Sequence, residues 1–90
     1  MKVPRIVHVK PLEELKLLVE FDDNTKKEYN VKRLLDKYEV FEKLKNKEVF
    51  NLVHVDCGGF GIAWTDEIDL SRYEIWHNGV PAQKQLVPGT

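Results

Sequence analysis

The residues of this chain best suited to chemistry are four carboxylates in its second half. Asp56 precedes a pair of glycines. Three more carboxylates closely follow Trp64, namely Asp66, Glu67 and Asp69. Such a group could bind a hard cation or supply a general acid and base, but it lacks the ligand spacing of an EF-hand loop. We favour solvated carboxylates, and the alternative is a small ligand-binding domain or enzyme that uses Asp56, Asp66 and Asp69.

Other reactive residue types are scattered along the chain. Cys57 could act as a nucleophile only if a histidine or a helix N-terminus lowered its pKa, and its place in a strand pattern favours a small buried hydrophobe. The histidines, at positions 8, 54 and 77, lack the short spacing of a helical zinc pair. We therefore expect no catalytic residues, no metal and no cofactor.

The glycines at 58 and 59 separate two β-rich runs, residues 53–57 and 60–64. A two-residue Gly-Gly loop suits the primed turns of β-hairpins, which require positive φ. The run lacks the glycine spacing and the following helix of a phosphate-binding loop, so we interpret Gly58 and Gly59 as a structural turn. Alternation across this hairpin predicts one apolar face. That face comprises Val53, Val55, Cys57, Phe60, Ile62 and Trp64.

A short helix is predicted after the carboxylate group. Ser71 and Glu74 have the spacing of a capping box. In such a box each of the two side chains accepts a hydrogen bond from the backbone N–H of the other residue. Asn78 and Gly79 tolerate the left-handed conformation that ends many helices. Pro81 would prevent the helix from resuming, so we expect about two turns.

The first half of the chain predicts a three-stranded antiparallel meander. Apolar residues alternate with polar ones over residues 15–21 and 26–31, and β-branched residues dominate residues 5–10. The short polar cluster at 22–25 predicts a tight turn.

A covering helix is predicted over residues 31–38, where Val31, Leu34, Leu35 and Tyr38 share one stripe. Asn30 is its expected N-cap, and Asn46 is expected to cap a later short turn. The fold class is therefore α+β: a meander, a covering helix, a C-terminal hairpin and a short terminal helix.

Composition sets the outer limits of function. The chain has 90 residues, enough for one small core, and we expect a single α+β domain over residues 1–80 with a flexible tail over 81–90. Its 14 basic and 15 acidic residues nearly cancel, so direct nucleic-acid binding is not expected. A single cysteine and the lack of a long apolar run indicate a cytoplasmic protein.

Three motifs in order carry a family resemblance: residues 55–64 (VDCGGFGIAW), 66–70 (DEIDL) and 76–79 (WHNG). Together they resemble the domain-of-unknown-function family numbered 2442, and the similarity covers nearly the whole chain before the tail. The resemblance implies a small bacterial α+β domain, found alone or joined to a helix-turn-helix domain. It also implies small partner proteins, as in toxin–antitoxin pairs, and it assigns no catalytic residues. Cys57 departs from the family pattern.

These observations favour a noncatalytic interaction module, either antitoxin-like or a regulatory accessory domain. Exposed sheet edges would allow β-strand pairing with another protein or with a second copy of the chain. An acidic and aromatic surface would supply further partner contacts. Its expected residues are Trp64, Asp66, Glu67, Asp69, Trp76 and Asn78.

Overall fold

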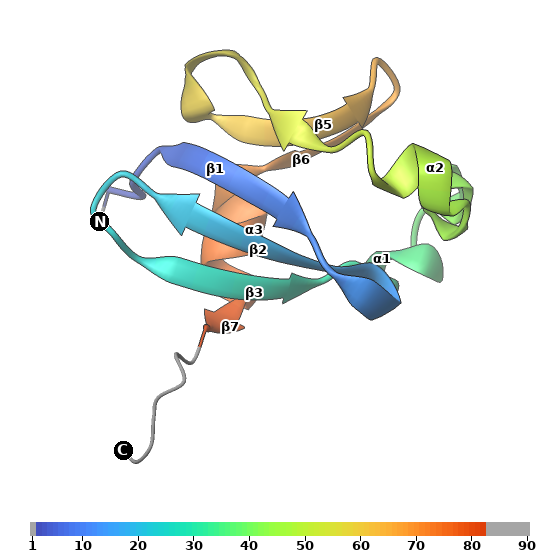
Figure 1. Ribbon diagram of the computed structural model, residues 1–90, viewed down its shortest axis with the longest axis horizontal. Coiled ribbons are helices and arrows are strands. Elements are labelled where there is room, and N and C mark those ends of the chain that lie inside the picture. Colours follow the sequence, from blue (N-terminus) through green and yellow to red (C-terminus); the bar gives the residue numbers. More distant parts are fainter. Residues whose placement is uncertain (1, 83–90) are drawn as a thin grey trace.

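The computed structural model describes residues 2–82, without the side chain of Cys57. Two antiparallel sheets form an α+β fold (Figure 1). The first sheet has the order β1-β2-β3-β7. Its strands are β1 (Ile6–Pro11), β2 (Lys16–Phe21), β3 (Lys26–Asn30) and β7 (Val80–Pro81). The predicted meander is confirmed, and the edge strand β7 extends it beyond the sequence prediction.

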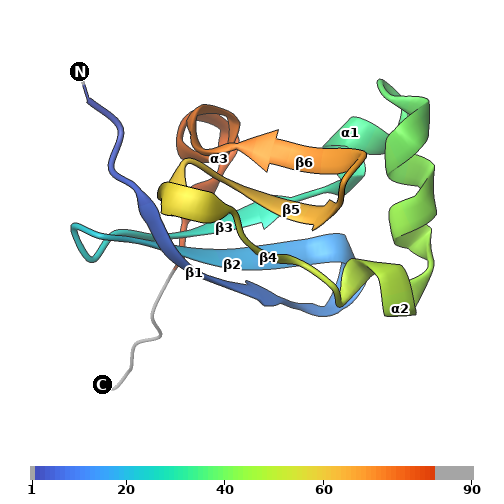
Figure 2. The same ribbon diagram turned by 90° about the horizontal axis from the view of Figure 1, so that it is seen from above.

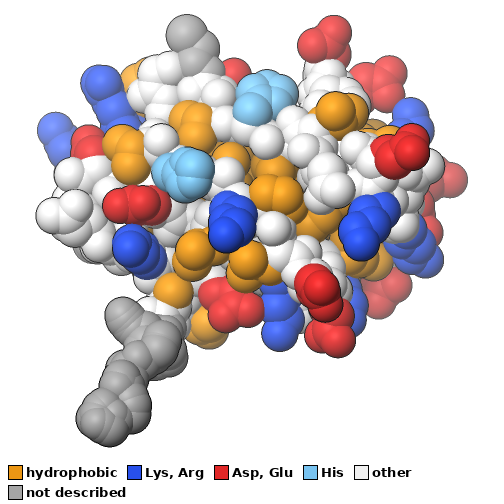
Figure 3. All heavy atoms as spheres, viewed as in Figure 1, with side chains coloured by type: hydrophobic (Ala, Val, Ile, Leu, Met, Phe, Trp, Pro, Cys, Tyr) orange, Lys and Arg blue, Asp and Glu red, His pale blue; other side chains and the backbone are white. Residues whose placement is uncertain are grey.

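Period-two alternation decides which face of the first sheet is buried. Leu17, Val19 and Phe21 of β2 are fully buried, whereas the residues between them are only partly covered. The outward face carries mixed charges with scattered apolar side chains (Figure 3). In one row across it, Lys10 of β1 and Glu28 of β3 flank Leu18. This mixture leaves no broad apolar face on the outside of the sheet.

The segment between the sheets is less helical than predicted. It contains α1 (Lys32–Leu35), a 3-10 segment η2 (Glu39–Lys45) and α2 (Lys47–Phe50). The helix predicted to reach Tyr38 ends early, because residues further on compete for the core: Leu44 is fully buried and Phe41 nearly so, while Tyr38 is left exposed. Asn46 caps α2 as expected, and its Oδ1 accepts a hydrogen bond from Glu48 N at 2.9 Å.

The second sheet has the order β4-β5-β6, with β4 (His54–Val55), β5 (Gly61–Thr65) and β6 (Ile68–Ser71). The pairing of Val55 with Ile62 is the register that the glycine loop predicted. The loop itself is wider than predicted, because Cys57–Gly59 forms a 3-10 turn (η3). Both glycines have positive φ, 80° at Gly58 and 76° at Gly59, as expected.

Two predictions about this hairpin are wrong. Phe60 is 54% exposed instead of facing the core, since the wider turn ends before it and two arginines cover its ring. Residues 68–71, for which no strand was predicted, form β6 because Ile68 fills the core. The predicted burial of Cys57 concerns a side chain outside the described residues.

Helix α3 (Arg72–Asn78) covers the inner face of the first sheet (Figures 1 and 2). The Ser71 Oγ caps it, accepting from Glu74 N at 3.2 Å. The left-handed end predicted at Gly79 is wrong, because its φ is −78°. Glycine is needed there for space instead, since a Cβ would lie 2.7 Å from the Ile75 carbonyl oxygen.

The chain after α3 returns to the first sheet. Pro81 pairs with Lys27 at the sheet edge, and Ala82 N donates to the Lys26 carbonyl at 3.0 Å. These two residues of the predicted tail are therefore part of the sheet, and residues 83–90 lie outside the described range. Across residues 2–82 no helix has the length and apolar character needed to cross a membrane.

Candidate functional site

The six residues predicted to form one surface do not lie together. Trp64 is only 2% exposed and packs in the core, with its ring centroid 6.3 Å from that of Phe50 and 6.2 Å from that of Phe41. A residue so deeply buried cannot contact a partner, and its assignment to the surface is corrected. Trp64 instead anchors the η2–α2 segment against the second sheet.

Three of the four carboxylates singled out in the sequence lie in or next to an exposed turn. Asp66 and Glu67 connect β5 to β6, and Asp69 lies on β6 with its side chain exposed. Glu67 Oε1 lies 3.3 Å from Lys43 Nζ, a pair that is mostly in solvent and so contributes little to stability. This turn borders a pocket of about 320 Å³, whose lining mixes Glu67 and Asp69 with Lys37.

The alternative grouping of Asp56, Asp66 and Asp69 is not formed. Asp56 N bonds the carbonyl of Gly61 at the start of β5, whereas Asp66 follows Thr65 at the other end of that strand. Five residues of extended chain separate these ends by roughly 15 Å. Within residues 2–82 no three Asp, Glu, His or Cys side chains are arranged to hold a metal ion, although the side chain of Cys57 is not described.

Trp76 and Asn78 lie on α3, away from the acidic turn. The Trp76 ring packs edge-on against Phe21 at 4.9 Å, and Lys27 Nζ lies 4.6 Å above it while donating to the Trp76 carbonyl at 2.7 Å. These contacts attach the C-terminal end of α3 to the first sheet. Asn78 is exposed beside a small hollow that is also lined by Lys16 and Glu28.

Glu74 links three elements by its carboxylate. Its Oε2 accepts from the Tyr29 hydroxyl at 2.7 Å and from Arg33 Nη1 at 3.1 Å. Burial, followed by the hydrogen bond to Glu74, raises the pKa of Tyr29 above its ordinary value. A phenol held in its protonated form is a poor nucleophile, so this arrangement holds β3, α1 and α3 together and does not prepare chemistry.

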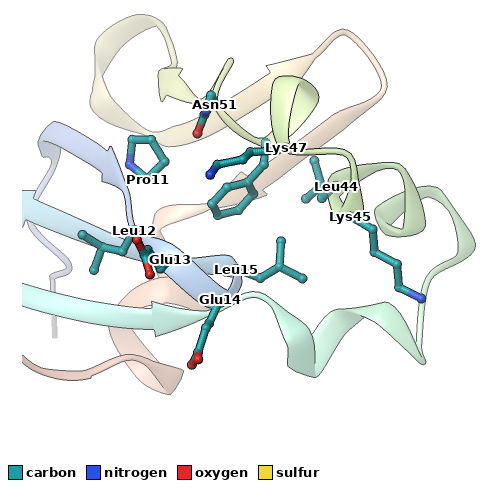
Figure 4. A pocket seen from close by; sticks show the side chains of 10 residues that line it. Pro11, Leu12, Glu13, Glu14, Leu15, Leu44, Lys45, Lys47 and Asn51 are labelled. Carbon is teal, nitrogen blue, oxygen red and sulfur yellow. The ribbon is translucent and has the colours of Figure 1, made fainter.

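A larger concavity lies elsewhere, between the β1–β2 connection and the η2–α2 segment (Figure 4). We name it the hairpin groove. Its volume is about 640 Å³, within the range of ligand sites. The lining residues are Pro11, Leu12, Glu13, Glu14, Leu15, Leu44, Lys45, Lys47, Phe50 and Asn51.

One wall of the hairpin groove is a strained turn. Glu14 has φ 61° and ψ 36°, and Leu15 has φ 61°, so two successive residues with side chains adopt positive φ. Hairpin turns of this kind favour Asn and Gly, because a Cβ raises the energy of the left-handed region. The turn is held by backbone bonds, from Leu12 N to the Lys16 carbonyl at 2.8 Å and from Val31 N to the Leu15 carbonyl at 2.9 Å.

The charges around the hairpin groove are unevenly placed. Lys47 extends across the opening toward the hairpin, whereas Lys45 and Glu14 point outward (Figure 4). Lys45 is already paired with Glu42 at 2.9 Å. Lys47 forms no ion pair with any residue from 2 to 82, so its ammonium group is available to a ligand. The groove can therefore hold an apolar side chain and attract a nearby carboxylate.

Sequence reasoning missed this site. Residues 11–14 separate two predicted strands, and no site was predicted there, although Leu12 and Leu15 flank two glutamates where a hairpin favours Asn-Gly. The sequence feature that could have indicated the site is this pair of apolar residues around a turn sequence that hairpins disfavour. The opposite wall could not be identified, because Leu44, Lys47 and Phe50 lie about thirty residues later in the chain.

The structure defines a small α+β domain with two antiparallel sheets and an open groove at one end. The family model "Protein of unknown function (DUF2442)" matches residues 6–81, and the chain belongs to this family. Comparisons with curated proteins and with solved structures find no match.

Proposed function

We propose that this domain is a noncatalytic protein-interaction module that binds an apolar segment of a partner protein in the hairpin groove. The observation that carries the proposal is the strained turn at Glu14 and Leu15 beside the groove. Left-handed residues with side chains cost about 1 to 2 kcal/mol each and are concentrated at functional sites. An Asn-Gly turn would connect the same strands without this strain.

The side chain of Leu15 explains why the positive φ values of this turn are retained. Its side chain lines the groove opposite Leu44, so the turn places an apolar residue in the wall where glycine would leave a gap. The groove is open along one side, which suits a chain segment better than an enclosed small molecule.

Charge specifies the partner further. A segment that places a large apolar side chain between Leu12 and Phe50 would bring its neighbouring residue close to Lys47. A carboxylate at that position would form an ion pair partly shielded from solvent. The proposed partner segment is therefore apolar with an adjacent acidic residue. An antitoxin-like protein or a regulatory accessory domain would use such a groove to hold its target.

The test is affinity capture from the native cell with two matched variants. Leu12→Ser with Lys47→Glu alters the groove, whereas Leu18→Ser with Lys10→Glu makes the same changes on the outer face of the first sheet. We expect the groove variant to lose the captured protein and the control to retain it. With the purified partner, calorimetry should show a loss of about tenfold or more in affinity for the groove variant alone.

Two results would contradict the proposal. Capture of the same partner by both variants would show that binding occurs on another surface. Failure of the unaltered domain to retain any protein would remove the basis for an interaction module. Circular dichroism of each variant checks that the fold is preserved.

The acidic turn offers a second docking face for the same function. Asp66 and Glu67 are exposed and project from the β5–β6 turn. If a basic region of the partner meets them, Asp66→Lys with Glu67→Lys should slow association, mainly at low salt, because steering is screened beyond about 8 Å at physiological ionic strength. An association rate equal to that of the unaltered domain in low salt would exclude this face.

A further inference from the structure

We infer that a second binding surface, formed by two arginines and two aromatic rings, holds the carboxylates of an acidic segment of a partner protein. We name it the arginine–aromatic cluster, and it consists of Arg5, Phe60, Arg72 and Tyr73. The guanidinium carbons of Arg5 and Arg72 lie 5.0 and 4.9 Å from the centroid of the Phe60 ring. Arg72 also lies 4.9 Å from the centroid of Tyr73.

The arginines of this cluster lack anionic partners. Over residues 2–82, neither Arg5 nor Arg72 takes part in an ion pair. Arg72 Nη2 donates to the Tyr73 hydroxyl at 3.1 Å, while its Nε and Nη1 are buried and have no hydrogen-bond partner in that part of the chain. Buried donors without partners are uncommon in native structures, and here they belong to a charged group.

Contact with the aromatic rings holds both guanidinium groups in place and uses only one of their hydrogen-bond donors, Arg72 Nη2. A guanidinium above an aromatic ring keeps its N–H groups in its own plane, where they can donate in pairs to a carboxylate. Two such groups share the Phe60 ring, so their central carbons are within about 10 Å of each other, and each repels the other. An anion beside the ring, close to both groups, would offset that repulsion and accept from the exposed guanidinium of Arg5.

Part of each ring remains accessible to a partner. Phe60 is 54% exposed and Tyr73 is 51% exposed, although both are large and apolar enough to be buried in a core. Tyrosine and arginine are enriched among the residues that dominate binding energy in protein interfaces. The cluster therefore combines apolar contact area with directed positive charge.

An acidic protein segment fits these surroundings better than a nucleic acid. Nucleic acid would bring one phosphate for every few ångströms of its length against only two cations. The Phe60 ring is also covered by guanidinium groups, which reduces its use for base stacking. A short segment with two or three carboxylates matches the available charge.

This inference does not rest on the hairpin groove. The β4–β5 loop that carries Phe60 and the N-terminal segment lie at one end of the molecule, and α2 with the groove lies at the other (Figures 1 and 2). The two surfaces share no residue. The domain would consequently be able to contact two segments at once, from one partner or from two.

The test is titration of the ¹⁵N-labelled full chain with a hexaglutamate peptide, followed by amide chemical shifts. The variant Arg5→Gln with Arg72→Gln removes the cluster's charges, and Lys10→Gln with Lys32→Gln removes the same charge at exposed sites that form no ion pair among residues 2–82.

We expect amide chemical-shift changes centred on Phe60 and Tyr73. We also expect about a tenfold loss of affinity in the arginine variant, from two charge-assisted contacts, and little change in the lysine variant. Arg5→Gln alone, at an exposed residue, serves if the double variant unfolds, and should weaken binding by about threefold.

Three outcomes would overturn the inference. The first is no shift with hexaglutamate up to about 1 mM, where even a weak site would begin to fill. The second is equal weakening in the lysine variant, which would show unspecific attraction. The third is tighter binding of a hexathymidine oligonucleotide that is lost in the arginine variant, which would assign the cluster to nucleic acid.

Discussion

Replacement of Tyr29 by phenylalanine tests how the first sheet is joined to α3. Tyr29 is fully buried, and its hydroxyl donates to Glu74 Oε2 at 2.7 Å. Phenylalanine keeps the ring in the core and removes only the hydroxyl. Tyr38→Phe is the matched control, because Tyr38 is exposed and its hydroxyl forms no hydrogen bond with residues 2–82.

The expected loss follows from the partners of Glu74. A hydrogen bond to a charged group contributes about 1.5 to 3 kcal/mol. The Glu74 side chain is 30% exposed and keeps its contact with Arg33 at 3.1 Å, so the carboxylate is not left unsatisfied. We therefore expect the lower end of that range, about 1.5 kcal/mol, which lowers the urea midpoint by about 1 M for a domain of this size.

The same substitution should alter the dependence of stability on pH. The pKa of Tyr29 is raised in the folded state, so its contribution is fully present below the unfolded pKa of about 10 and is lost as the pH rises toward the folded pKa. In that window the unfolded chain releases a proton that the folded chain retains, which costs about 1.4 kcal/mol per pH unit. The phenylalanine variant lacks this dependence, so its deficit should shrink from about 1.5 kcal/mol at pH 8 to a few tenths at pH 11.

The assay is urea unfolding followed by tryptophan fluorescence at pH 8 and pH 11 for the unaltered domain and both variants. Comparison of the variants removes the titration of lysines, which is common to all three chains. A deficit below about 0.5 kcal/mol at pH 8 would refute the hydrogen bond. A deficit that stays constant to pH 11 would refute the raised pKa.

Three further predictions concern two turns and the cap of α3. Glu14→Asn should raise the free energy of unfolding by about 0.5 to 1 kcal/mol, because asparagine tolerates positive φ, and an unchanged urea midpoint would contradict the strained turn. Gly59→Ala should lower the free energy of unfolding by about 2 to 3 kcal/mol, since its Cβ would lie 2.5 Å from the Ile6 carbonyl oxygen. Gly58→Ala should lower it by about 1 kcal/mol, because its Cβ would meet only the Phe60 ring. Equal losses of stability in calorimetric melting would reject this difference. Ser71→Ala should cost about 1 kcal/mol through loss of the α3 cap, and Ser71→Asn should restore most of it in the same measurement.

Local patterns predicted the parts of the fold that are decided within a few residues. Alternation identified β2 because every second residue of it is buried, and the Ser71 cap was visible from its spacing to Glu74. The strand β6 was missed although Ile68 and Leu70 alternate with acidic residues, since four residues give a weak signal. The helix over residues 31–38 failed because burial of Phe41 and Leu44 outweighed a favourable stripe.

The site was harder to predict because it depends on contacts between distant segments. The enrichment of tryptophan at binding hot spots suggested a surface position for Trp64, whereas strand alternation placed it on the apolar face of the hairpin. Its position between Phe41 and Phe50 is decided by packing. Both arginines of the cluster were unremarkable in the sequence, since Arg5 and Arg72 meet only when the β4–β5 loop brings Phe60 between the N-terminal segment and α3. No local rule predicts such a meeting.

The hairpin groove and the arginine–aromatic cluster each contain residues that depart from local structural preferences. A chain selected only for stability would place Asn-Gly in the first hairpin and would give Arg72 a carboxylate partner. This chain instead has Glu14 and Leu15 in left-handed conformations at one end, and at the other end Arg72 retains two buried donors without partners among residues 2–82. Elements between these ends follow local rules more closely: β2 alternates, and side chains cap α2 and α3. Departures from local preference that lie beside exposed or open apolar surface, as they do at both of these ends, are expected of a domain whose ends bind other molecules.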